Sequence, residues 1–231
     1  MNVLVTAGNT QTPIDRVRCV TNIFTGRTGA RVAVEAHRRG HAVTFLTSHP
    51  EVIDGPAPDP ARWRVTQYRT YDDLDRLMGE LIPSGGFDAV IHAAAVSDYA
   101  VAGVYAGPAP GAAPVDAAGK IKSHHDELWL RLVPTAKLVD KVRGEWGFRG
   151  VLVKFKLEVG VTESELLAVA ERSRLQSAAD AMVANAFETR HQWAYLGVRG
   201  GPYERLTRSE LAPRLLAAVE ELHGTTPTQS G

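Results

Sequence analysis

The chain has 231 residues, 44% of them hydrophobic, which is enough to bury the core of one α/β domain with or without an appended lobe. Lysine plus arginine and aspartate plus glutamate number 26 each, so no net charge attracts the chain to nucleic acid or to an anionic membrane. The single cysteine, Cys19, excludes an internal disulfide and a cysteine-based metal cluster, and the lack of a long apolar run or an apolar leader after Met1 predicts a cytoplasmic protein.

The first segment of the chain predicts a strand, a polar loop and a helix. The run from Val3 to Val5 is typical of a buried parallel strand, and a helix is expected from Arg27. The loop between them contains Gly8 and Gly26, and Gly29 lies in the first helical turn. Free amides at a helix start, with glycines that let a ligand approach the backbone, favour a bound phosphate. Alternatively, these glycines serve only tight turns and helix packing, since they match neither the P-loop nor a clean GxGxxG motif.

Strand and helix patterns alternate along the rest of the chain. Further strands are expected at residues 41–47, 65–68, 87–95, 127–133, 151–157, 181–185 and 191–198, the last followed by a hairpin-like turn at 199–202. Helices are expected at residues 27–40, 71–81, 134–142, 162–176 and 209–222. This alternation predicts a single α/β domain over residues 1–223, with a doubly wound, mostly parallel, Rossmann-like sheet and a small C-terminal β/α extension.

The strand expected at residues 87–95 leads into a polar segment that contains Asp98. In open α/β sheets ligands bind at the carboxyl ends of parallel strands, so Asp98 is a candidate site residue. The small side chains of Ala94 and Ala95 would let a substrate lie against the backbone. Tight packing of a helix on the sheet is an equally good explanation for these alanines.

The segment from Ala100 to Gly119 is rich in alanine, glycine, proline and valine and shows little periodicity. Because a structureless loop longer than about 12–15 residues is usually functional or disordered, we expect a mobile flap over about residues 100–122. The flap ends at Lys120 and Lys122, which would deliver positive charge to a polyphosphate or would belong to a solvated basic edge strand. The polar tail at residues 224–231 is expected to be disordered.

Six separated segments carry a pattern found together in one family. They are TAG-T--PID-VR--TN---G--G at residues 6–29, AAAVSDY at 93–99, KIKS at 120–123, LVPTAKL at 132–138, FKLE at 155–158 and VAN at 183–185. In this order they resemble phosphopantothenate–cysteine ligase, the phosphopantothenoylcysteine synthetase of coenzyme A biosynthesis. Many bacteria fuse this ligase behind a flavin-dependent decarboxylase, and because no such segment precedes Met1, the stand-alone form is expected.

The resemblance implies a ligase reaction in two steps. The carboxylate of 4′-phosphopantothenate attacks the α-phosphorus of a nucleoside triphosphate and expels pyrophosphate. The amine of L-cysteine then displaces the nucleoside monophosphate from the acyl-nucleotide. The family implies that Mg²⁺ is carried by the nucleotide, and no protein side chain is assigned to the metal.

The resemblance also implies roles for individual residues. Asn22 and Lys120 match catalytic positions, Asn22 at the substrate acid and the acyl-nucleotide and Lys120 at acyl-nucleotide formation. Arg18 matches a substrate-side arginine that reaches the neighbouring subunit, which implies a homodimer. The nucleotide-binding positions are matched by Gly8, Thr25, Gly26, Gly29, Asp98, Phe155 and Asn185. The further substrate-binding positions are matched by Asn22, Ala94, Ala95 and Asp98.

Three departures from the family pattern bear on the nucleotide. Phe24 stands where the family usually has serine, so one phosphate-contacting hydroxyl is missing, and whether Thr25 replaces it is open. The FKLE segment is of the eukaryotic type, and Ser173 and Ser177 occupy positions where CTP-using bacterial enzymes carry lysines. We therefore expect ATP in preference to CTP, although the same changes also fit a relaxed specificity.

Two other functions remain open from the sequence. A short-chain NAD(P)-dependent oxidoreductase fits the fold class, but no Tyr-x-x-x-Lys motif follows a strand at the expected place, and His49 and Pro50 stand where an acidic ribose ligand is expected. The other alternative is a diverged regulatory protein that binds nucleotide without turnover. In this case Phe24 and the missing lysines would explain the loss of turnover. Cys19 is expected to be a small buried thiol, and His92 a hydrogen-bonded core residue.

Overall fold

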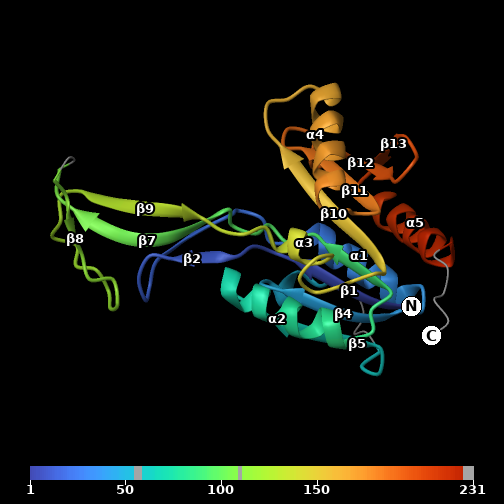
Figure 1. Cartoon of the computed structure of the whole chain (residues 1–231), viewed down its shortest axis with the longest axis horizontal. Coiled ribbons are helices and arrows are strands. Elements are labelled where there is room, and N and C mark those ends of the chain that lie inside the picture. The colour runs from blue at the N-terminus through green and yellow to red at the C-terminus, as the bar shows by residue number, and fades with distance from the viewer. Residues whose placement is uncertain (55–58, 109–110, 226–231) are drawn as a thin grey trace.

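A computed structural model of the protein describes residues 1–54, 59–108 and 111–225. Its centre is an eight-stranded sheet (Figure 1) with the order β13 (Tyr203–Thr207), β12 (Trp193–Val198), β11 (Ala181–Ala186), β10 (Val151–Glu158), β6 (Ala89–His92), β1 (Asn2–Ala7), β4 (Ala42–Thr47) and β5 (Trp63–Gln67). The strands from β11 to β5 run parallel, while β12 and β13 are antiparallel. The predicted doubly wound, Rossmann-like sheet is confirmed, and its strand order reverses beside β1, where such sheets bind ligands.

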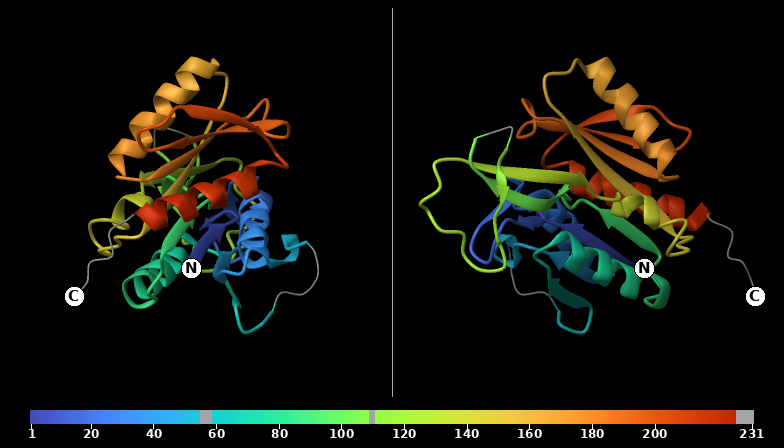
Figure 2. Two further views of the ribbon diagram at one scale, coloured as in Figure 1. Left: turned by 90° about the vertical axis from the view of Figure 1, so that its right-hand side faces the viewer. Right: turned by 60° about the vertical axis from the view of Figure 1, so that its left-hand side comes forward.

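Helices cover both faces of this sheet (Figure 2). They are α1 (Arg27–Arg38), α2 (Tyr71–Ser84), α3 (Leu138–Lys141), α4 (Glu163–Gln176) and α5 (Leu211–Thr225), with a short 3-10 turn, η1, at Pro50–Val52. The first and last helices pack on one face, and α2, α3 and α4 pack on the other. None of the helices in the described ranges is both long and apolar enough to cross a membrane.

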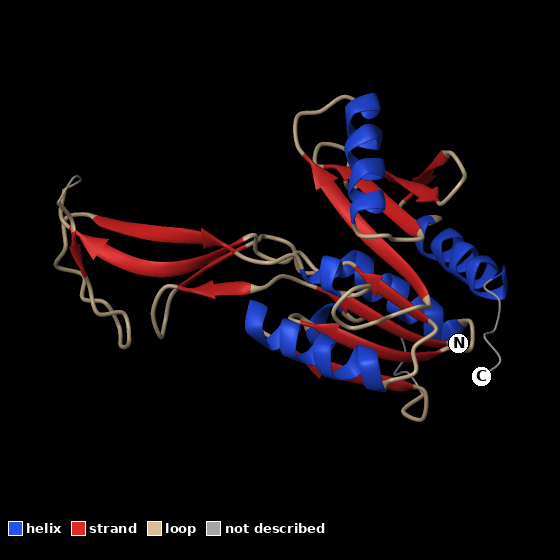
Figure 3. Cartoon of the chain, in the orientation of Figure 1, coloured by secondary structure: helices blue, strands red, loops and turns tan. Residues whose placement is uncertain are grey.

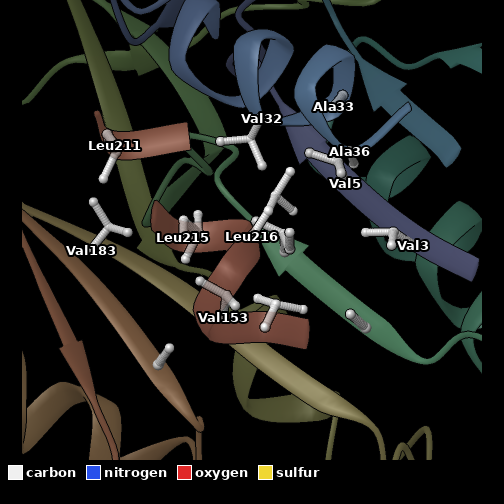
Figure 4. Packing of buried hydrophobic residues seen from close by; sticks show 14 of the residues in the cluster. Val3, Val5, Val32, Ala33, Ala36, Val153, Val183, Leu211, Leu215 and Leu216 are labelled. Carbon is white, nitrogen blue, oxygen red and sulfur yellow. The ribbon is translucent and has the colours of Figure 1, made fainter. Parts of the chain in front are cut away.

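The apolar strand β1 supplies both cores because successive side chains of a strand point to opposite faces. Val3 and Val5 lie in the core with α1 and α5, where Leu215 and Leu216 pack against the sheet (Figure 4). Leu4 points the other way, into the cluster under α2. Packing of β1 side chains on both faces of the sheet therefore fixes how this strand is oriented, and this orientation sets the position of the loop that follows it.

A three-stranded antiparallel arm projects from the sheet (Figure 3). It consists of β7 (Tyr99–Ala106), β8 (Ala113–Pro114) and β9 (Leu128–Pro134), and the ribbon of β2 (Gln11–Pro13) and β3 (Cys19–Thr21) lies near its base. The prediction of an irregular flap is therefore wrong for the β7 residues, which pair with β9. Both faces of β7 are partly exposed, so its sequence carries no alternating pattern from which the strand could be predicted.

Three local predictions need correction, and one strand was missed. The helix expected at 134–142 is reduced to α3, because Pro134 pairs with Tyr99 at the end of β9 and keeps the chain extended. The tail expected from residue 224 is wrong for residues 224 and 225, since α5 continues to Thr225, and residues 226–231 lie outside the described ranges. Strand β13 was not predicted, although the turn before it was. Cys19 is exposed and not buried, because it lies in the narrow ribbon of β2 and β3.

Candidate functional site

A cavity of about 640 Å³ opens at the carboxyl ends of the central parallel strands. Its walls come from the loop after β1, the start of α1, the segment after β6, the ends of β10 and β11, and the segments around β12 and α5. The predicted site residues that line it are Gly8, Thr25, Gly26, Gly29, Ala94, Ala95, Phe155 and Asn185. Segments far apart in the sequence thus meet at one place, although the role of each residue stays a prediction.

The glycines of this cavity serve two different purposes. Gly26 has a φ of 83°, and a Cβ placed there would collide with the backbone of Gly8, so only glycine permits this approach of the two loops. Gly29 has an ordinary helical backbone, but a Cβ there would lie 2.5 Å from the Cβ of Ala7. Gly29 therefore serves the close packing of α1 on β1, which was the alternative interpretation, while Gly26 shapes the loop itself.

Helix α1 begins at the cavity wall without a side-chain cap and without an acidic residue in its first turn. The first backbone amides of a helix have no acceptor within it and attract an anion. Arg27 and Arg31 add positive charge at this same end, where the helix dipole makes it unfavourable. Neither arginine forms an ion pair within the part of the chain that the structure describes, so this helix start lacks a negative partner.

Arg208 joins three walls of the cavity through its guanidinium group. It donates to the Oδ1 atom of Asn185 at 2.9 Å and to the Oγ1 atom of Thr28 in the first turn of α1. Burial lowers the pKa of Arg208, and the nearby Arg31 lowers it further. No ion pair joins Arg208 to a carboxylate in residues 1–54, 59–108 or 111–225. A partly buried cation of this kind is stabilised when an anionic ligand enters.

The charged side chains of the cavity lining are basic. Its positively charged side chains are Arg27, Arg31, Lys156, Arg190 and Arg208, and no aspartate or glutamate is among the described lining residues. Lys156 already pairs with Glu158 at 2.9 Å, so the arginines carry most of the unmatched charge. A ligand with several negative charges fits this wall best.

Asn22 lies beside the cavity, held against one of its walls. Its Nδ2 atom donates to the backbone oxygen of Ala95 at 3.1 Å, and Ala95 in turn donates its amide to the Gly8 oxygen at 2.7 Å. No other hydrogen bond to the Asn22 side chain is seen among the described residues, so its Oδ1 atom and a second N–H are available to a ligand. The structure therefore brings Asn22 next to the predicted nucleotide residues.

Asp98 does not reach the cavity. It lies just before β7, is exposed, and pairs with Lys137 at 3.2 Å. The chain turns away from the sheet here because Thr135 donates its amide to the Asp98 oxygen at 2.9 Å, which starts the pairing of the arm. Asp98 is therefore not among the residues that line this cavity, and its binding role stays a prediction.

Arg18 and Lys120 lie together where the turn between β2 and β3 meets the loop between β8 and β9, and neither is among the cavity-lining residues. Asp15 is buried beside Arg18, and this guanidinium holds the pKa of the Asp15 carboxyl far below its usual range. Asp15 also accepts from the amide of Ile121 at 3.1 Å, and Arg18 donates to the Ile121 oxygen at 2.8 Å. These bonds fix the backbone next to Lys120, whose own side chain is exposed.

Comparison with known proteins identifies the family. The model of the DNA/pantothenate metabolism flavoprotein C-terminal domain matches residues 1–221. The chain belongs to this family. A relative from Thermococcus kodakarensis, named coenzyme A biosynthesis bifunctional protein CoaBC, is 33% identical over 95% of this chain and 51% of its own length. The protein of the same name from Escherichia coli is 27% identical over 80% of this chain and 41% of its own. This family member thus spans about half the length of these relatives, or less.

Solved structures agree with the observed fold. The DNA/pantothenate metabolism flavoprotein from Streptococcus pneumoniae superposes with a TM-score of 0.82, is 27% identical, and covers 96% of this chain and 99% of its own. The Cab2 H337A mutant in complex with phosphopantothenate-cysteine has a TM-score of 0.73 at 19% identity, over 97% of this chain and 88% of its own. Because the identity to the Cab2 structure is only 19%, this similarity shows a common fold and nothing more.

Several lining residues of this family member were missed from the sequence. Arg208, Arg190 and His191 come from the last third of the chain, and no local pattern separates them from surface residues. Arg27 and Arg31 did carry a signal, because basic side chains in the first turns of a helix oppose its dipole. That signal, together with the glycines before the helix, would have identified the anion-binding end of the site.

Two further observations concern the buried histidine and the metal-ligating side chains. His92 is buried and its Nδ1 atom lies 2.9 Å from the Thr6 Oγ1 atom, while burial, with a smaller effect of Lys154, lowers the pKa of His92 to about 4. It is the satisfied core residue that was expected. Within the described ranges, no three histidine, cysteine, aspartate or glutamate side chains gather closely enough to hold a metal ion.

Proposed function

We propose that the protein is a phosphopantothenate–cysteine ligase, which joins 4′-phosphopantothenate to L-cysteine with a nucleoside triphosphate as co-substrate. The observation that carries this proposal is the cavity with its tight glycine loop, its uncapped helix start and arginines that form no ion pair among the described residues. A triphosphate supplies the negative charge that these groups lack. Membership of the family, and the coenzyme A biosynthesis named for its relatives, support the same activity.

The proposed reaction has two displacements. In the first, a carboxylate oxygen of 4′-phosphopantothenate forms a bond to the α-phosphorus, and the bond from that phosphorus to pyrophosphate breaks. In the second, the amine of L-cysteine forms a bond to the acyl carbon, the bond from that carbon to oxygen breaks, and the amine loses a proton. The products are phosphopantothenoylcysteine, pyrophosphate and the nucleoside monophosphate.

The first displacement requires two anions to approach each other. The amides at the start of α1 and the guanidinium of Arg208 are suited to hold the phosphates and to neutralise part of their charge. Asn22 is suited to hold the acid, because its amide donates a hydrogen bond without adding charge or acting as a nucleophile. We propose that Lys120 supports the departure of pyrophosphate, from a backbone that Asp15 anchors.

The second displacement passes through a tetrahedral centre with negative charge on oxygen. A neutral amide donor such as Asn22 stabilises this charge without repelling the incoming amine. The open space beside Ala94 and Ala95 leaves room for the acyl chain along the backbone. Asn22, Ala94 and Ala95 would therefore act in both steps, as expected when the acyl-nucleotide stays bound in the site between the first step and the second.

The nucleotide is proposed to be ATP, bound together with Mg²⁺ as a substrate complex. Phe155 and Asn185 both line the cavity, where a ring would face an aromatic side chain and an amide. The Oδ1 atom of Asn185 is already taken by Arg208, so its amide nitrogen is the group left for the base. An amide nitrogen donates to ring acceptors of either adenine or cytosine, and the preference for ATP therefore continues to depend on the sequence departures.

We also propose that the active form is a homodimer in the cytoplasm, with Arg18 near the subunit boundary. The arm and the adjacent ribbon expose large apolar side chains, which is unfavourable in a monomer. They are Val17, Val20, Tyr99, Leu128, Trp129 and Leu132. Sedimentation of the purified protein at micromolar concentration tests this: a dimer is expected, and a monomer under turnover conditions would contradict it.

The experiment that tests the function is turnover of the purified protein with 4′-phosphopantothenate, L-cysteine, Mg²⁺ and each of ATP, CTP, GTP and UTP. The expected result is pyrophosphate and a nucleoside monophosphate in equal amounts, with ATP preferred. Nucleotide binding without products would instead support the diverged regulatory protein. Reduction or oxidation of a nicotinamide would support the oxidoreductase.

A further inference from the structure

Asn9 is a buried amide at the carboxyl end of β1, next to the glycine loop of the cavity. Its Nδ2 atom donates to the backbone oxygen of Asn22 at 2.5 Å. Its Oδ1 atom accepts from the Oγ atom of Ser48 and lies 3.1 Å from the Nε2 atom of His49. Position 9 is one that the family motif of residues 6–29 leaves open, and neither the motif nor the proposed reaction gives it a role.

The partners fix which way this amide faces. The Asn22 carbonyl can only accept a hydrogen bond, so the nitrogen of Asn9 faces Asn22 and the oxygen faces His49. The Nε2 atom of His49 therefore carries a hydrogen and donates it. The Nδ1 atom of His49 lies 2.7 Å from the Glu51 carboxylate. The His49 ring is thus held by Glu51 on one side and directs a hydrogen to Asn9 on the other.

Ser48 completes the support of Asn9. Its hydroxyl accepts the backbone amide of Asn9 at 2.9 Å and donates to the Asn9 oxygen at 3.1 Å. The loop after β4, which carries Ser48, His49 and Glu51, is therefore connected through Asn9 to the loop that carries Asn22. Both the donor and the acceptor ends of the Asn9 amide are used in this connection.

Asn22 is consequently held at two points. Its backbone oxygen is bound by Asn9, and its side-chain nitrogen is bound to Ala95. If the first contact is lost, the backbone of Asn22 can rotate about the second, and the free Oδ1 atom and N–H move relative to the phosphate end of the cavity. Displacement of a reacting group by about 1 Å can cost roughly 100-fold in rate.

We propose that Asn9, supported by Ser48 and His49, is a positioning residue that sets the orientation of Asn22 toward the substrate acid. The consequence for turnover rests on the proposed ligase function. The structural part, which is the restraint of the Asn22 segment by Asn9, is independent of it.

The decisive variant is Asn9→Asp, which has the same shape and keeps the acceptor that faces Ser48 and His49. It replaces the donor that faces the Asn22 oxygen by a second acceptor, so this contact becomes repulsive. We expect kcat to fall by about 10- to 100-fold, with the KM for nucleotide within about threefold of the wild type. In the substrate-free protein, hydrogen exchange of residues 19–25 should be faster by about fivefold or more, as expected for the loss of one hydrogen bond.

A matched control is Asn2→Asp at the opposite end of β1. Asn2 also donates its Nδ2 atom to a backbone oxygen, that of Gly85, at 2.9 Å. This variant should lower the melting temperature, but leave kcat and the exchange of residues 19–25 as in the wild type. At position 49, glutamine keeps a side-chain donor and leucine does not, so His49→Gln should retain most of kcat while His49→Leu should lose it.

Wild-type kcat in Asn9→Asp, or unchanged exchange of residues 19–25, would overturn the positioning role. An equal loss of kcat in Asn2→Asp would overturn it too, since the effect would then be one of general stability. If the wild-type protein forms no product with any nucleotide, the proposed function fails. The exchange of residues 19–25 in Asn9→Asp still decides whether Asn9 restrains the Asn22 segment.

Discussion

Replacing Arg208 by methionine should separate nucleotide binding from folding. Methionine keeps most of the apolar stem and removes the guanidinium that bridges Asn185 and Thr28. In the ligand-free protein this removes a partly buried cation that is near Arg31 and without a carboxylate partner in the described ranges. The two lost hydrogen bonds and the relieved charge oppose each other, so we expect the free energy of unfolding to stay within about 1 kcal/mol of the wild type.

The effect on nucleotide binding should be much larger. A hydrogen bond between charged groups contributes about 1.5–3 kcal/mol, which corresponds to a rise of about 10- to 150-fold in the Kd for the nucleotide. At a nucleotide concentration 100 times the wild-type Kd, binding stabilises the wild type by about 2.7 kcal/mol. The same concentration should stabilise Arg208→Met by only about 0.3–1.4 kcal/mol.

Thermal unfolding with and without MgATP measures both quantities at once. For a chain of this size 1 kcal/mol shifts the melting temperature by about 2–4 °C, so the wild type should gain about 5–11 °C and Arg208→Met about half of this or less. Arg214→Met is the matched control, because Arg214 lies on the surface of α5 and pairs with Glu204 of β13. A full wild-type gain in Arg208→Met, or an equal loss in Arg214→Met, would refute the assignment of Arg208 to the phosphates.

Three further variants test separate parts of the account. Asn22→Asp places a negative charge against the substrate acid and should abolish turnover with the melting temperature nearly unchanged; activity in a steady-state assay would exclude the role of Asn22. Lys120→Ala should slow pyrophosphate release by about 100-fold or more in single turnovers at saturating ATP, whereas a change confined to the Kd would assign Lys120 to binding. Glu220→Gln tests the contact between α1 and α5, where Arg39, and secondly His41, lower the pKa of Glu220 to about 2 from 4.5. This stabilisation is complete above about pH 4.5 and is lost as the pH falls toward 2. The Glu220 side chain is 32% exposed, and after allowance for this exposure the variant should be less stable than the wild type by about 1–2 kcal/mol at pH 7. Near pH 2 the two proteins should be equally stable. Equal urea midpoints at pH 7 would contradict it.

The central sheet, apart from its edge strand β13, could be predicted because its signals are local. The apolar run of β1 specifies a strand with both faces buried, and Thr162 caps α4 through a capping box with Glu165. In the arm, the strand expected at residues 127–133 is confirmed by β9, but β7 could not be predicted in the same way. Strand β7 pairs with residues about 30 positions later and exposes part of both faces, so neither periodicity nor composition distinguishes it from a loop.

The same distinction between local signals and contacts of distant residues applies to the candidate site. Gly8, Gly26 and the start of α1 are close in sequence, and their spacing was enough to predict an anion site. Arg208 contacts Thr28 across 180 residues, and only the packing of α5 and β13 on the sheet brings it there. Lys120 was matched by its motif, but its distance from the cavity depends on how Asp15 anchors the arm, which the motif does not encode.

The most direct test of the ligase account is to follow oxygen from the carboxylate of 4′-phosphopantothenate. With ¹⁸O in both carboxylate oxygens, attack on the α-phosphorus followed by displacement by the amine predicts one ¹⁸O atom in each nucleoside monophosphate, detected by mass spectrometry beside unlabelled pyrophosphate. Label in inorganic phosphate, with a nucleoside diphosphate as the other product, would contradict the acyl-nucleotide pathway. Absence of product with all four nucleotides would contradict the function itself.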